Sequence, residues 1–174
     1  MNRAQIVEQL PGLRRYARAL TGNAWAADDL VQDTLERACR KWLLWRSGSD
    51  LRAWLFTLMH NLYLNQRRAT VLVQALDAEA LAAVADRHDG SRETALDLDR
   101  CLQRLPPEQR AVLLLVTLED MAYADVARVL DVPVGTVMSR LSRARARMRE
   151  LMEAAPTTTQ PCGAGAPVAL RRMK

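Results

Sequence analysis

The stretch YADVARVLDVPVGTVMSRLSRARARMRE, residues 123–150, joins a short apolar segment to an arginine-rich one through a turn that contains proline. Apolar residues recur every three or four positions in its second half, a spacing that places them on one face of a helix. We therefore predict two helices, Tyr123–Leu130 and Val134–Met152, separated by a three-residue turn. This arrangement is typical of a helix-turn-helix, whose second helix enters the major groove of DNA.

The second of these helices carries the positive charge of a DNA-binding surface. Five arginines fall between positions 140 and 149, and Glu150 is the acidic residue beside them. Arginine binds phosphates and guanine edges through two parallel hydrogen bonds, which suits it to this place. A solvated charged face and a coiled coil are the alternatives. The concentration of like charge disfavours the first, and the apolar repeat is too short to support the second.

The composition of the whole chain predicts an all-α fold. Of its 174 residues, 49% are apolar and 26% are charged, and helix formers outnumber the β-branched and aromatic residues that are typical of strands. Five further helices are expected: four at about 4–20, 24–45, 51–68 and 107–118, and one that carries Leu98, Leu102 and Leu105 and ends before Pro106. Pro11 is expected to kink or split the first of them, because proline lacks a backbone donor.

Net charge divides the chain into blocks. Residues 1–68 carry +5, residues 69–97 carry −4, residues 98–153 carry +1 and residues 154–174 carry +3. We predict two small helical domains, 1–68 and 98–153, joined by a flexible acidic linker and followed by a disordered tail.

The sequence gives no support for export, disulfide bonds or catalysis. The first residues contain no apolar signal-peptide core, and Cys39, Cys101 and Cys162 are odd in number and widely spaced. We therefore expect a cytoplasmic protein with free thiols. Metal-ligand spacings, glycine-rich phosphate loops and nucleophile elbows are also missing. We expect no metal, no cofactor and no enzymatic activity.

Three stretches together resemble the extracytoplasmic-function (ECF) group of RNA polymerase sigma factors, in the sigma-70 family. They are ADDLVQDTLERA (27–38), LRAWLFTLMHNLYLNQRR (51–68) and LPPEQRAVLLLVTLEDMAYADVARVLDVPVGTVMSRLSRAR (105–145). In that group the first stretch grips the clamp helices of the polymerase, the second melts promoter DNA beside the −10 element, and the third reads the −35 element. The resemblance implies a sigma-2-like bundle followed by a sigma-4-like helix-turn-helix domain.

The same resemblance implies the partners. They are core RNA polymerase, through its beta-prime clamp and beta flap, promoter DNA, and an anti-sigma factor that often holds such proteins at the membrane without inserting them. The acidic linker is either a solvated tether or a segment that runs near the nucleic-acid channel of the polymerase. A stand-alone helix-turn-helix regulator, binding DNA without polymerase, is the alternative function.

Contact residues are carried over position by position. The polymerase contacts implied are Asp28, Asp29, Leu30, Gln32 and Asp33. Those implied for −10 DNA, where aromatic rings stack on unpaired bases, are Arg46, Ser49, Arg52, Phe56, His60, Asn61, Tyr63, Asn65, Arg67 and Arg68. Those implied for −35 DNA are Thr136, Met138, Ser139, Arg140, Ser142, Arg143 and Arg145.

This sequence departs from the family pattern at three places. Met138 stands where a basic residue is frequent, so that contact becomes apolar, for example with a thymine methyl group. Asp131 replaces the usual turn glycine, and aspartate tolerates the left-handed conformation better than most residues. The loop at about 45–50, where the family captures a flipped −10 base, is short.

Overall fold

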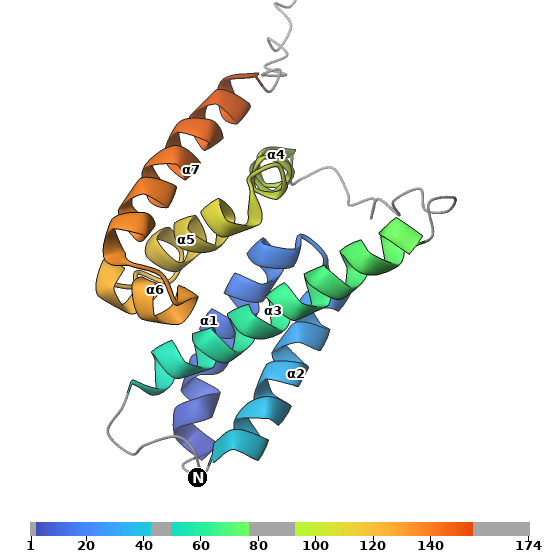
Figure 1. Ribbon diagram of the computed structural model, residues 1–174, viewed down its shortest axis with the longest axis vertical. Helices are drawn as coiled ribbons and strands as arrows, with labels where there is room; N and C mark the ends of the chain where they lie inside the picture. Colours follow the sequence, from blue (N-terminus) through green and yellow to red (C-terminus); the bar gives the residue numbers. More distant parts are fainter. Residues whose placement is uncertain (1–2, 43–49, 77–92, 155–174) are drawn as a thin grey trace, which may run out of the picture.

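The structure is a computed structural model that describes residues 3–42, 50–76 and 93–154. All regular elements among these residues are helices, which confirms the all-α prediction. They are α1 (Arg3–Thr21), α2 (Ala24–Lys41), α3 (Leu51–Leu76), α4 (Glu93–Gln103), α5 (Pro107–Thr117), α6 (Tyr123–Leu130) and α7 (Val134–Ala154). Helices α1, α2 and α3 form an amino-terminal bundle, and α4 to α7 form a carboxy-terminal one (Figure 1).

Local hydrogen bonds fix the beginnings and ends of the first helices. The Asn23 side chain accepts a bond of 3.0 Å from the Ala26 amide at the start of α2, and Asp50 accepts one of 3.1 Å at the start of α3. Such caps satisfy amides that have no partner within the helix. Gly22 closes α1 in the left-handed region, at φ +69°. Helix α1 runs through Pro11 as one element, so the expected split does not occur.

Helix α3 is longer than the sequence pattern indicates. It continues past Arg68 to Leu76, and α4 already begins at Glu93. The β-branched residues after Arg68 lower the expected helix propensity. Extending a helix that has already formed is much easier than nucleating one, which explains the difference. The rest of the predicted linker, 77–92, and the tail from 155 lie outside the described residues.

Helices α6 and α7 form the predicted helix-turn-helix. Asp131 joins them in the left-handed conformation, with φ 52° and ψ 52°, and its amide bonds to the Ala127 carbonyl. The inner face of α7 buries Val137, Leu141, Ala144, Met148 and Leu151. Val134, the first residue of α7, is 39% exposed because it lies at the start of the helix.

We expect the left-handed conformation of Asp131 to make the free energy of unfolding depend on the residue at this position. Asp131→Val should lower the free energy of unfolding by about 1–2 kcal/mol, because a β-branched side chain is strained at positive φ. Asp131→Gly should raise it slightly, since relief of strain exceeds the entropy that glycine loses on folding. Urea unfolding followed by circular dichroism measures both. A valine variant as stable as the wild type would contradict the strained turn.

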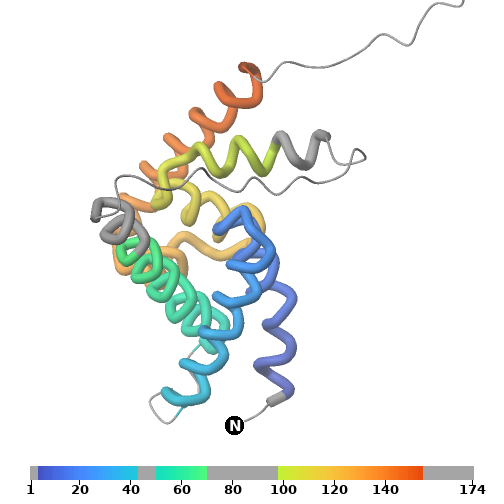
Figure 2. The backbone as a smooth tube through the Cα atoms, turned by 90° about the vertical axis from the view of Figure 1, so that its right-hand side faces the viewer, coloured from blue at the N-terminus to red at the C-terminus, as the bar shows by residue number. Residues whose placement is uncertain are grey.

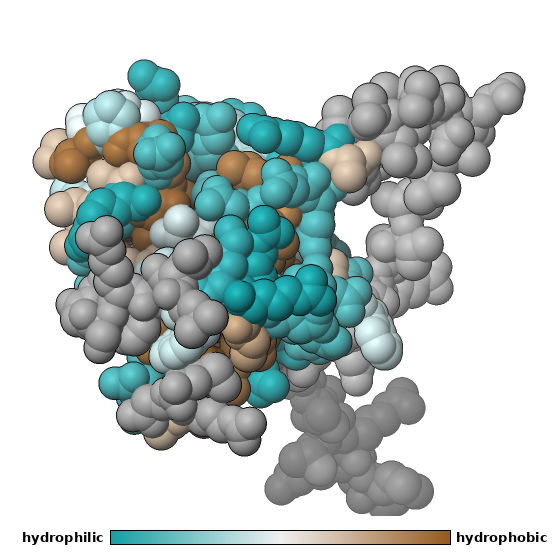
Figure 3. Space-filling view, turned by 60° about the horizontal axis from the view of Figure 1, so that its bottom comes forward, coloured by the Kyte–Doolittle hydropathy of each residue, from teal (hydrophilic) through white to brown (hydrophobic). Residues whose placement is uncertain are grey.

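The two bundles pack against each other, which the sequence does not predict. Helix α3 contacts α6, and α1 contacts both α4 and α5 (Figures 1 and 2). One continuous cluster of buried side chains runs through both bundles. On the face seen in Figure 3, apolar surface is broken into separate areas by hydrophilic side chains. No helix among residues 3–42, 50–76 and 93–154 has the length and apolar character needed to cross a membrane.

Candidate functional site

The acidic residues of α2 form an exposed face. Asp28, Asp29, Gln32 and Asp33 are exposed, and Asp33 accepts a hydrogen bond of 3.0 Å from the Gln66 side chain of α3. Leu30 is fully buried in the core of the amino-terminal bundle. The helical period turns it inward with Ala27 and Thr34, so Leu30 supports this face and offers no surface to a partner in this structure.

The outer face of α7 presents polar side chains away from the core. Met138 is 51% exposed, and Ser142, Arg143 and Arg145 are exposed beside it. Neither Arg143 nor Arg145 has an ion-pair partner among the described residues. These four side chains are therefore available to a nucleic acid. The remaining three candidates, Thr136, Ser139 and Arg140, are half-buried.

Two of these half-buried side chains are already engaged within the protein. The Ser139 hydroxyl donates to the Thr136 carbonyl at 3.1 Å, a bond within its own helix. Arg140 forms an ion pair of 2.6 Å with Glu108 of α5. Arg140 thus points toward α5 across the cleft between the bundles.

The −10 candidates of α3 are divided between its two faces. Asn61, Asn65, Arg67 and Arg68 are exposed, whereas His60 and Tyr63 are buried. Phe56 is fully buried and packs edge-on against Tyr16, with 5.3 Å between ring centroids. Phe56 is therefore a core residue in this arrangement, because the inward stripe of α3 passes through it. Arg46 and Ser49 lie outside the described residues.

Arg52 belongs to an ion-pair cluster that joins the bundles, which we call the Glu119 junction (Arg15, Arg52 and Glu119). Glu119 follows α5, and its side chain is 0% exposed. Arg15 of α1 donates to its carboxylate at 3.2 Å, and Arg52 of α3 at 3.0 Å. A Cβ atom on Gly12 would stand 2.7 Å from this carboxylate, so glycine permits the close approach of α1. Sequence spacing gives no signal for this cluster.

Arg110 makes a second link between the bundles. Its guanidinium donates to the Leu20 carbonyl at the end of α1, at 2.8 Å, and to the Gln103 carbonyl at 2.7 Å. Burial lowers the pKa of Arg110 from its ordinary value. A cation at this place satisfies a carbonyl that has no partner within α1 and complements the negative end of the helix. Its position inside an apolar run, QRAVLLLV, is the one sequence signal of an unusual role.

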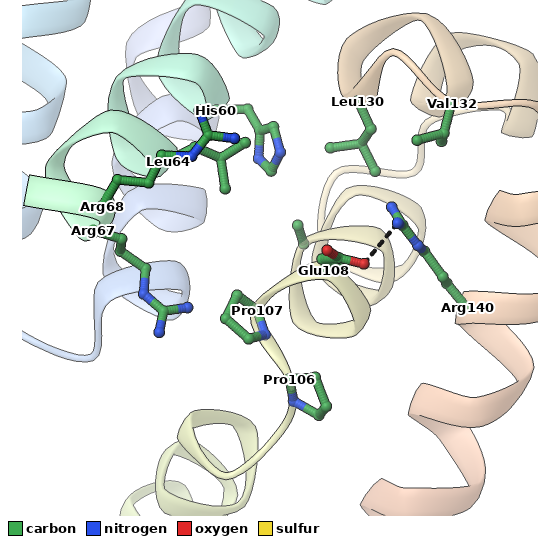
Figure 4. A pocket seen from close by; sticks show the side chains of 11 residues that line it. His60, Leu64, Arg67, Arg68, Pro106, Pro107, Glu108, Leu130, Val132 and Arg140 are labelled. Carbon is green, nitrogen blue, oxygen red and sulfur yellow. Dashed lines mark ion pairs between the residues drawn. The ribbon is translucent and has the colours of Figure 1, made fainter. Parts of the chain in front are cut away.

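A cleft of about 710 Å³ opens between the two bundles (Figure 4). Its walls come from α3, the start of α5, the end of α6 and α7. His60 lies on the α3 wall and Arg140 on the α7 wall, so a −10 candidate and a −35 candidate face the same space. No group of three or more His, Cys, Asp or Glu side chains in the described part of the chain is placed to hold a metal ion.

His60 has an unusual environment in this cleft. It is 7% exposed, and its Nδ1 atom has no hydrogen-bond partner among the described residues. Burial and, to a smaller extent, the nearby Arg140 guanidinium together lower the pKa of His60 to about 4. The imidazole is therefore neutral at pH 7, with one nitrogen that can donate a hydrogen bond and one that can accept.

We expect this lowered pKa to make stability depend on pH. Below about pH 6.5 the unfolded chain binds a proton that the folded chain does not bind until about pH 4. Stability is therefore lost as pH falls through this window, by about 2 kcal/mol between pH 7 and pH 5. Urea unfolding at the two pH values measures the loss. His60→Gln cannot titrate and should lose clearly less; an equal loss in both proteins would contradict the assignment.

Two protein families match the chain in sequence order. The family described as "Sigma2 domain of PhyR" matches residues 6–60, and "Sigma-70, region 4" matches residues 95–148. These ranges include the acidic face of α2 and most of α7. Residues 43–49, which lie outside the described residues, fall within the first range.

Relatives match over most of their length. The ECF RNA polymerase sigma factor EcfG of Rhodopseudomonas palustris (strain TIE-1) is 36% identical over 153 residues, which cover 86% of this chain and 84% of that protein. SigM of Mycobacterium tuberculosis is 37% identical over 140 residues, covering 80% and 71%. The sigma factor RpoE of Bartonella quintana, solved in complex with the anti-sigma factor NepR, superposes with a TM-score of 0.75 at 35% identity, over 87% of this chain and 96% of that one. The chain therefore belongs to the ECF group of RNA polymerase sigma factors, in the sigma-70 family.

Proposed function

We propose that the chain binds core RNA polymerase through the acidic face of α2 and reads promoter DNA with α7 and α3. As a member of its family, it directs promoter-specific initiation of transcription and leaves the chemistry to the polymerase. The observation that supports the assignment of DNA binding to α7 is the exposed face of this helix. Met138, Ser142, Arg143 and Arg145 stand free on the second helix of a helix-turn-helix, while the opposite face is fixed in the core.

The two DNA elements cannot be read together in the packed arrangement. Elements centred about 35 and 10 base pairs upstream of the start lie about 85 Å apart, at about 3.4 Å per base pair. Helix α6 packs directly on α3, and α7 packs on α6, so the two reading helices are only about 20 Å apart given a helix diameter of about 10 Å. We propose that the described structure is the closed form of the free protein and that the bundles separate on the polymerase.

We further propose the finer partners that the family implies. The acidic face of α2 would meet the beta-prime clamp, and the carboxy-terminal bundle would meet the beta flap. Similarity to a sigma factor solved with NepR supports an anti-sigma partner for this chain as well. We place the protein in the cytoplasm, where the polymerase acts, with anchoring at the membrane supplied by that partner.

A gel shift separates this proposal from a stand-alone regulator, which family membership does not favour. A sigma factor should bind promoter DNA poorly alone and well with core enzyme. The direct test is transcription in vitro with core enzyme and a library of genomic promoter fragments. Start sites that appear only when the chain is added would support the proposal, and the selected fragments would reveal the −35 and −10 sequences. Strong binding of DNA by the free chain, with no polymerase-dependent start sites, would contradict it.

A further inference from the structure

We propose that the cleft between the bundles is a binding site for a small amphipathic anion, an organic carboxylate or phosphate attached to an apolar body. The cleft volume of about 710 Å³ falls within the usual range of small-molecule sites, about 300–1,000 Å³. Such sites are frequent where domains meet, and this cleft lies at that position. Its identity as a site rests on three features: an apolar wall, uncompensated positive charge and an unpartnered buried nitrogen.

The apolar wall accepts the body of the ligand. The apolar side chains that line the cleft are Leu64 of α3, Ala111 of α5, Leu130 at the end of α6 and Val132 in the turn that follows. In Figure 4 the Leu64, Leu130 and Val132 side chains project into the space between the helices. Transfer of apolar ligand surface from water to this wall favours binding.

Positive charge selects an anion at the rim of the same cleft. Arg67, Arg68 and Arg140 line it, and the one acidic side chain among its lining residues is Glu108, which pairs with Arg140. Two of the three arginine charges are thus uncompensated within the cleft. Arg68 has no ion pair or hydrogen bond among the described residues, and Arg67 lies over the Tyr63 ring at 6.0 Å from its centroid.

His60 supplies a hydrogen bond deeper in the cleft. Burying a polar nitrogen without a hydrogen-bond partner is unfavourable, and a hydrogen bond to a ligand oxygen would remove that penalty. The Nδ1 atom of His60 is such a nitrogen, and the imidazole can present its N–H there. A carboxylate or phosphate between α3 and α7 would accept this bond while meeting the Arg68 and Arg140 guanidinium groups.

Occupancy of the cleft would stabilise the closed form. A ligand that contacts α3 and α7 together binds only when the bundles are packed, so it shifts the equilibrium toward that arrangement. It would also occupy His60, Arg68 and Arg140, which we assign to promoter DNA. Repression of transcription by the ligand rests on the proposed function, whereas binding of the ligand to the free chain does not. A binding measurement therefore tests the ligand site independently of the proposed function.

The test is isothermal titration of the full chain with decanoate, with decanol and acetate as matched probes. Decanol keeps the apolar body without the charge, and acetate keeps the charge without the body. We expect decanoate to bind at least tenfold more tightly than decanol, and acetate to show no binding. Decyl phosphate then distinguishes a phosphate headgroup from a carboxylate by which of the two binds more tightly. Equal binding of decanol and decanoate, or binding of an acidic peptide but of neither decanoate nor decyl phosphate, would overturn the site.

Variants separate a formed site from detergent-like adsorption. Arg68→Gln and Arg140→Gln should each weaken decanoate binding at least fivefold, whereas Arg68→Lys should retain most of it. Arg128→Gln, which changes an exposed arginine of α6 paired with Asp125, should leave binding unchanged. Circular dichroism confirms that each variant is folded. Wild-type affinity in both glutamine variants would overturn the proposal.

Discussion

Asp29→Arg is expected to lower the affinity of the chain for core RNA polymerase by at least tenfold while leaving the bundle folded. Asp29 is exposed on α2 and lies beyond the first turn of a helix that begins at Ala24. Compensation of the helix dipole fades after that turn, so it does not account for an acidic residue here. Charge reversal would place like charges across the proposed contact, which is among the costliest changes at an interface. Fluorescence anisotropy of the labelled chain with core enzyme, at two salt concentrations, measures the loss.

Arg143→Ala is expected to have the opposite effect, loss of −35 recognition with polymerase binding retained. Arg143 is exposed on the outer face of α7 and has no ion-pair partner among the described residues, whereas α2 packs on α1 and α3. Its removal should reduce transcription from −35-dependent promoters about tenfold or more, since a good arginine–guanine contact is worth about 1–3 kcal/mol. Binding to core enzyme should be unchanged. Loss of both activities in either variant would refute the assignment of polymerase binding to α2 and −35 recognition to α7.

Glu119→Ala is expected to separate the two bundles. The Glu119 carboxylate is 0% exposed and holds Arg15 of α1 and Arg52 of α3, so its removal deletes an ion-paired contact from the interface. Removing one member of a fully buried ion pair costs about 3–5 kcal/mol. The arginines here are 56% and 38% exposed and can return to water, so we expect about 2 kcal/mol. Energy transfer between dyes on α2 and α7 should show the greater distance.

The order of effects at the Glu119 junction gives a sharper test. Arg15→Ala combined with Arg52→Ala leaves a carboxylate buried without either cation, so this double variant should be less stable than Glu119→Ala. Arg128→Ala removes an exposed ion pair with Asp125 and should change neither stability nor dye distance appreciably. A Glu119→Ala protein with the wild-type dye distance would show that other contacts, such as those of Arg110, hold the bundles together.

Much of the fold followed from short-range patterns. The helix-turn-helix was predicted because its apolar stripe repeats with the helical period and its turn contains an aspartate that tolerates positive φ, and Asp131 has φ 52°. The sequence analysis did not predict the last part of α3, because β-branched residues lower the local helix propensity. A helix that has already formed extends through such residues more easily than a new helix begins there.

For the candidate site residues, too, the sequence predicted some features and only the tertiary structure decided others. The helical period determined that Asp29 and Arg143 lie outside and Leu141 inside, because each is fixed by neighbours three or four residues away. The tertiary structure alone decided that Glu119 pairs with Arg15 and Arg52 of the other bundle, that Phe56 packs on Tyr16, and that His60 and Arg140 share a cleft. The residues of each pair are dozens of positions apart in the sequence. The apolar period of one helix does not indicate which distant helix packs against it. The sequence thus determined which face of each helix is buried, and the packing of whole helices decided what each face meets.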